Sequence, residues 1–123
     1  MQYLLLIHSD EAAWERLSPA QIEGIMGRYG ETHRAMQEAG VIRAAHRLQS
    51  PTSATTVRKR GGELLTTDGP FAELKEQLGG FFLIEVPDLD EAIRWAARIP
   101  ASEYGAVEVR PIRTECPNVQ ASR

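Results

Sequence analysis

Cysteine is almost absent from this sequence, with Cys116 its only example. One thiol can close no internal disulfide and form no paired-cysteine zinc motif, which agrees with a reducing compartment. Long apolar runs are missing too. The run at residues 3–7 is far too short to cross a bilayer, and it lacks the basic segment and cleavage site of a signal peptide. We therefore expect a cytoplasmic protein without membrane association.

The sequence also has no segment in which charges of one sign are concentrated. The chain has 14 basic and 17 acidic residues, a formal net charge of -3, and no basic block, so we expect no nucleic-acid binding. It contains no GxGxxG, P-loop or GxSxG pattern, which argues against nucleotide cofactors and serine-hydrolase chemistry. Its three histidines show no metal-ligand spacing. We predict neither a cofactor nor a metal site.

What is present suits one small globular domain. The chain has 123 residues, of which 42% are hydrophobic and 25% charged. A chain of this size buries about two-thirds of its unfolded surface, which is enough to fold without disulfides. We expect a single domain over residues 1–112. A polar tail without periodicity follows at 113–123.

Two helices have clear start signals. Ser18 and Gln21 form a capping box with a proline between them, and apolar residues then recur at helical spacing as far as Gly40. Asp88 and Glu91 form a second capping box before a helix that reaches residue 97. Three glycines weaken the first helix and would allow another element to pack closely on it: Gly24, Gly27 and Gly30.

The other elements follow from β-prone runs and glycine punctuation. Two glycines between β-prone runs predict a tight hairpin. The sequence predicts strands at 3–7, 41–47, 55–59, 63–67, 81–86 and 107–110, and a short helix at 72–78.

The order of elements predicts an α+β fold: a ferredoxin-like βαββαβ domain with an inserted β-hairpin. Both helices then cover one face of the sheet. In strand 81–86, the row of Phe82, Ile84 and Val86 belongs under the helices, while Phe81 and Leu83 face away. A partly apolar open face indicates an interface, and a two-fold homodimer is its commonest form.

Residues 66–86, TTDGPFAELKEQLGGFFLIEV, closely resemble the signature of the DGPF branch of YCII-related proteins. Residues 1–11, 38–41 and 107–111 are similar to the same family. The resemblance implies a dimeric ferredoxin-like fold of the dimeric α/β-barrel type. Related domains include small enzymes, among them a dehydrochlorinase type acting on chlorinated aromatics, thought to use a His–Asp pair. The DGPF branch is often encoded beside extracytoplasmic-function sigma factors, so the resemblance implies a functional link to such a factor.

His8 and Asp68 are the candidate catalytic residues. Imidazole exchanges protons near neutral pH, and His8 follows Leu4 and Leu6 onto their face of the sheet. Asp68 begins the DGPF turn and could present a carboxylate at the mouth of a pocket. The structural alternatives are a hydrogen-bonded histidine at a strand end and a turn-forming aspartate. His33 lies on the apolar helix face, where most histidines are buried and hydrogen-bonded.

Six further residues are candidate ligand contacts because they belong to the DGPF turn, the segment after it or the open sheet face: Pro70, Phe71, Lys75, Glu85, Glu108 and Arg110. Each has a structural alternative. Phe71 could plug the core, Lys75 could lie on a solvated helix face, and charges on the last strand could form exposed ion pairs. Arg110 could instead clamp a ligand carboxylate.

Two functions remain open at this point. In the first, the protein is a non-catalytic module that binds a small organic ligand in an inter-subunit cleft and is tied to sigma-factor regulation. In the second, it is a cofactor-independent lyase-like enzyme in which His8 is the general base and Asp68 orients it.

Overall fold

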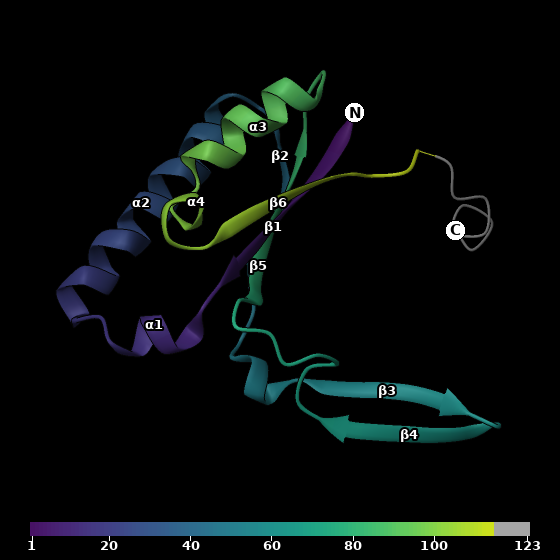
Figure 1. The fold of residues 1–123 in the computed structure, drawn as a ribbon. Coiled ribbons are helices and arrows are strands. Elements are labelled where there is room, and N and C mark those ends of the chain that lie inside the picture. Colours follow the sequence, from purple (N-terminus) through teal and green to yellow (C-terminus); the bar gives the residue numbers. More distant parts are fainter. Residues whose placement is uncertain (115–123) are drawn as a thin grey trace.

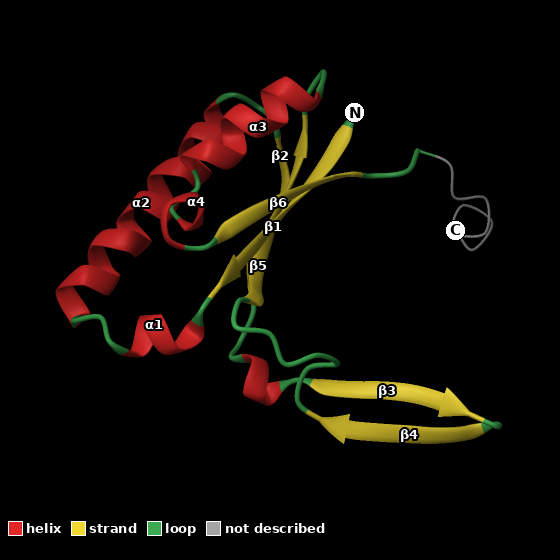
Figure 2. Cartoon of the chain, viewed as in Figure 1, coloured by secondary structure: helices red, strands yellow, loops and turns green. Residues whose placement is uncertain are grey.

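The computed structural model describes residues 1–114 and confirms the α+β, ferredoxin-like architecture (Figures 1 and 2). A four-stranded sheet has the order β2-β5-β1-β6, with every neighbouring pair antiparallel. Strands β3 and β4 form a separate two-stranded sheet. The elements are β1 (Gln2–Ser9), α1 (Glu11–Glu15), α2 (Pro19–Glu38), β2 (Ile42–Arg47), a 3₁₀ turn (Pro51–Ser53), β3 (Thr55–Arg60), β4 (Glu63–Asp68), β5 (Gln77–Glu85), α3 (Leu89–Arg98), α4 (Ala101–Tyr104) and β6 (Ala106–Pro111).

The capping box predicted for α2 forms completely, whereas at α3 only the Asp88 half forms and the Glu91 side chain pairs with Arg94 instead. At the start of α2, the Ser18 hydroxyl accepts from the Gln21 amide, and the Gln21 side chain accepts from the Ser18 amide. At the start of α3, Asp88 accepts from the amide of Glu91. Gly40 follows α2 with φ of 71°, a left-handed conformation that lets the chain turn into β2.

Helices α2 and α3 lie on one face of the sheet (Figure 1). The inward rows of the central strands supply the core beneath them. Leu5 and Ile84 are completely buried, as are Met36 on α2 and Ala92 on α3. The predicted inward row of Phe82, Ile84 and Val86 is confirmed, because all three side chains are buried.

The opposite face of the sheet has no helix of the described chain on it (Figure 1). Strand alternation and register place Leu4, Leu6, Phe81 and Leu83 there, and all four are half-buried. We call this surface the open face.

Among the described residues, no helix has the length and apolarity needed to span a membrane.

The predicted hairpin is confirmed, with Gly61 and Gly62 at its tip at φ of 57° and 80°. These positive values suit the tight turn that right-handed strand twist favours. The hairpin projects away from the helix layer (Figure 2), and the side chains of β4 are exposed along its whole length.

The predicted helix at 72–78 is wrong. Residues 71–76 form bends and coil, and β5 already begins at Gln77. The Gln77 side chain donates to the carbonyls of Ala72 and Leu74, at 3.1 and 2.9 Å, which holds this segment in a non-helical path. Gly80 lies within β5 because a Cβ there would approach the His46 carbonyl oxygen to 2.7 Å.

Two other expectations need correction. The short helices α1 and α4 lie outside the predicted elements, and Asp10 starts α1 by accepting from the Ala12 amide. Close packing does not explain the glycines of α2, because a Cβ added to any of them would meet no atom within 4 Å. Most of the predicted tail, including Cys116, lies outside the described residues.

Candidate ligand-binding site

A cavity of about 890 Å³ lies between α2 and one end of the sheet. Its lining comes from both helical and sheet layers: α1, the middle of α2, α4, the ends of β1 and β2, the segment after β2, and the start of β5. Most of its lining therefore lies on the helix side of the sheet, and Phe81 of the strand β5 also borders it.

The cavity exists because facing positions carry little or no side chain. Gly30 lines it from α2, and Ala45, Gly79 and Gly80 line it from β2 and β5. A Cβ on Gly30 would meet nothing within 4 Å, so the space beside this helix is empty. Close packing would ordinarily fill such a gap with side chains. Gly30 and Gly79 thus leave room for a ligand, whereas Gly80 is required by the close approach of the backbone at His46.

Aromatic side chains form one wall of the cavity. Trp14 on α1 meets Tyr104 on α4 edge to face, with ring centroids 6.0 Å apart. The hydroxyl of Tyr104 lies 3.1 Å from that of Tyr29 on α2. Burial is the main cause that raises the pKa of Tyr29 and Tyr104, and the nearby Arg47 opposes it in both. Both hydroxyls are therefore protonated at neutral pH and can donate hydrogen bonds.

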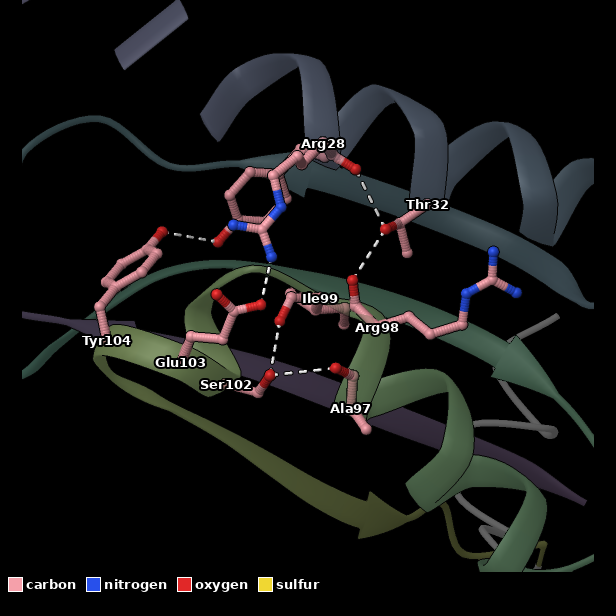
Figure 3. Close-up of polar contacts among 9 residues, drawn as sticks. Arg28, Thr32, Ala97, Arg98, Ile99, Ser102, Glu103 and Tyr104 are labelled. Atoms are coloured by element: carbon pink, nitrogen blue, oxygen red, sulfur yellow. Dashed lines mark hydrogen bonds and ion pairs between the residues drawn. The ribbon is translucent and has the colours of Figure 1, made fainter. Parts of the chain in front are cut away.

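Helices α3 and α4 are both held to α2 by side-chain contacts (Figure 3). Arg28 on α2 forms an ion pair with Glu103 on α4. Thr32, which is buried, donates to the carbonyl oxygens of Arg98 and Arg28, at 2.9 and 3.1 Å. These contacts fix the position of the tyrosine pair relative to the sheet.

Of the other polar side chains in the cavity lining, some form hydrogen bonds within the protein and others do not. Glu11 accepts a hydrogen bond of 2.9 Å from the Ser50 hydroxyl. His33 lines the cavity with its ring centroid 6.3 Å from that of Phe82. Within residues 1–114, neither His33 nor Arg47 makes a side-chain hydrogen bond. Both are therefore available to a ligand, and the expectation of a hydrogen-bonded core histidine at His33 is wrong.

The structure places His8 on the open face, outside the cavity lining. Its Nε2 lies 3.2 Å from Oε1 of Glu108, and Glu108 in turn pairs with Arg110 at 2.9 Å. Glu85 on the same face pairs with the N-terminal amine at 3.2 Å. The sequence candidates His8, Glu108 and Arg110 thus come together, in a linear array of charges across two strands.

The DGPF candidates lie elsewhere. Asp68 is exposed at the end of β4, opposite Thr55, and no hydrogen bond among the described residues joins it to His8. Gly69 adopts φ of 98°, which confirms the turn. Phe71 is 77% exposed, so it does not plug the core. Lys75 is exposed in the loop, and neither it nor Pro70 lines the cavity.

Sequence reasoning missed the principal cavity residues, including Glu11, Trp14, Tyr29, Arg47 and Tyr104. They come from separate elements and form no motif. The sequence held one signal: a glycine in a helix, Gly30, and a pair of glycines in a strand that this helix covers, Gly79 and Gly80. No group of three or more potential metal ligands occurs in the part of the chain that the structure describes.

The fold and its helix-side cavity define a ferredoxin-like α+β domain with a built-in pocket. The sequence profile of the YCII-related domain matches residues 1–115, and the chain belongs to this family. It is 39% identical over 114 residues to an uncharacterized protein of Rhizobium meliloti (strain 1021), an alignment that covers 91% of this chain and 92% of that one. The predicted family relationship is confirmed.

Proposed function

We propose that this protein binds a small organic molecule in the cavity between α2 and the sheet. One observation carries the proposal: the cavity measures about 890 Å³, within the range of about 300–1,000 Å³ typical of small-molecule sites. Its walls also have the expected character, because they are mainly apolar and aromatic with a few polar groups.

The residue at position 30 is consistent with ligand binding in the cavity. Side chains could occupy the space at Gly30 without a clash, yet the position is a glycine within a long helix. A glycine inside a helix costs about 1 kcal/mol relative to alanine. At Gly30, which lines the cavity, the missing side chain leaves space that a ligand can occupy.

The open face supports a second part of the proposal, a homodimer. Leu4, Leu6, Phe81 and Leu83 share this face, and a self-complementary apolar surface is the usual basis of a two-fold dimer. An inter-subunit cleft over this face is a second candidate ligand site. The functional link to a sigma factor stays a prediction that rests on the family resemblance.

A lyase-like activity in that cleft is the alternative function. The observation that favours it is the contact of 3.2 Å between His8 and Glu108, which couples an imidazole to a carboxylate. A general base is commonly oriented in this way. In this arrangement Glu108 takes the orienting role that the sequence suggested for Asp68.

A pair of glycine variants tests binding in the cavity. Gly30→Leu places a side chain in the cavity, while Gly27→Leu adds the same side chain to the same helix outside the cavity lining. The probe is N-phenyl-1-naphthylamine, a neutral dye whose fluorescence rises in apolar sites. We expect saturable binding to the wild type and to Gly27→Leu, and its loss in Gly30→Leu. Equal binding by all three proteins would refute the proposal.

A further inference from the structure

We propose that the cavity selects organic anions: molecules with an apolar, ring-sized body and a carboxylate or similar group bound by Arg47 and the Tyr29–Tyr104 hydroxyl pair. This inference rests on the proposed function and names the ligand class of the same site. Arg47, Tyr29 and Tyr104 all line the cavity, from β2, α2 and α4 respectively.

Arg47 supplies the positive charge. It is the last residue of β2 and is exposed at the cavity lining. The neighbouring Arg28 is neutralised by Glu103, whereas no ion pair of Arg47 occurs among residues 1–114. A planar guanidinium with free N–H groups suits a carboxylate, which it can hold through two hydrogen bonds.

The tyrosine pair supplies a directed donor beside this charge. Arg47 lines the same cavity as the pair, and its charge opposes the rise in pKa that burial causes in both tyrosines. The two hydroxyls are 3.1 Å apart, so one proton lies between them and the other is free to point elsewhere. An anion between Arg47 and the pair would accept that free proton.

The cavity lining also holds a carboxylate, that of Glu11, which is engaged by a hydrogen bond within the protein. Glu11 is held by the Ser50 hydroxyl at 2.9 Å and is followed on α1 by Trp14, whose ring contacts Tyr104. The aromatic rings and Met26 then leave an apolar space for the body of the ligand. General attraction of anions is not expected, because the whole chain has a net charge of -3.

A matched pair of ligands tests the inference by calorimetry: 2-naphthoate and its neutral isostere, 2-naphthamide. We expect the wild type to bind the acid at least about tenfold more tightly, a difference of about 1.4 kcal/mol. Arg47→Gln should weaken the acid to the level of the amide and leave the amide unchanged. Arg58→Gln, an equally exposed arginine on β3, should behave as the wild type.

The outcomes separate the two claims. If acid and amide bind equally and Gly30→Leu abolishes both, the cavity binds ligands but the anion selectivity is refuted. If Gly30→Leu leaves both affinities unchanged, the proposed function itself fails. Tyr104→Phe tests the tyrosine pair independently of Arg47. Removing one hydroxyl of the pair should reduce the preference for 2-naphthoate over 2-naphthamide by several-fold. An unchanged preference in both Arg47→Gln and Tyr104→Phe would overturn the inference.

Discussion

The hydroxyl of Tyr29 on α2 lies 3.1 Å from the hydroxyl of Tyr104 on α4, and this contact joins two elements 75 residues apart in sequence. It closes the aromatic wall of the cavity and gives the protein a specific response to alkaline pH. Burial raises the pKa of both groups above the ordinary value of 10.0.

Alkaline conditions should therefore destabilise the fold through this pair. Because the folded-state pKa is the higher one, the contribution of each tyrosine is complete below pH of about 10 and is lost as the pH rises through the folded-state pKa. Urea unfolding at pH of about 9 and about 11 should show a larger loss in the wild type than in a Tyr29→Phe/Tyr104→Phe double variant. Equal losses would contradict this role of the pair.

The buried Thr32 hydroxyl should stabilise the contact between α2 and α3. It donates to the carbonyl oxygen of Arg98, in the last turn of α3, where carbonyls have no partner within the helix. Thr32→Val should lower the free energy of unfolding by about 1–3 kcal/mol, because the carbonyl stays buried without a donor. The exposed Thr66→Val on β4 is the control and should change it by less than about 0.5 kcal/mol.

The adjacent glycines of β5 should differ sharply in tolerance. A Cβ on Gly80 would lie 2.7 Å from the His46 carbonyl oxygen, whereas a Cβ on Gly79 would lie 3.9 Å from its nearest neighbour. Gly80→Ala must push β2 from β5 and should cost about 1–3 kcal/mol or more. Gly79→Ala should cost under about 1 kcal/mol. Similar urea midpoints for the two variants would argue against this strand geometry.

The open face should control the oligomeric state. Sedimentation of the wild type at micromolar concentration should report a dimer, and Leu83→Glu should convert it to a folded monomer by placing a charge on the apolar face. Leu89→Glu, on the exposed first turn of α3, should leave the dimer intact. A monomeric wild type would refute the proposed homodimer and its inter-subunit cleft.

The main elements could be predicted because local signals and periodicity agree there. The capping box at Ser18, the N-cap at Asp88 and the glycine turn at Gly61 each act within a few residues. The alternation of Phe81 and Phe82 also assigned the two faces of β5 correctly. These features depend on spacing along the chain, which the sequence displays directly.

The segment at 72–78 could not be predicted in this way. Its residues favour a helix by intrinsic propensity, but the chain there follows long-range constraints. The side chain of Gln77 holds the carbonyls of Ala72 and Leu74, and Gly80 must lie against the backbone at His46. Tertiary contacts therefore override the local preference.

The cavity was beyond sequence reasoning for a different reason. It is defined by side chains that are missing at Gly30 and Gly79, and by polar groups brought together from separate elements. Helical spacing placed His33 on the inward face but gave no sign that the space beneath it is empty. The sequence candidates His8, Glu108 and Arg110 do lie together, on the other face of the sheet.

Mapping a ligand onto the two faces tests the central claim most directly. Amide chemical shifts of ¹⁵N-labelled protein are followed during titration with 2-naphthoate. Binding in the helix-side cavity predicts saturable shifts at Gly30, His33 and Gly79, with those of Leu4 and Leu83 unmoved. Shifts confined to the strands' open-face residues, with the three cavity amides unmoved, would contradict the account.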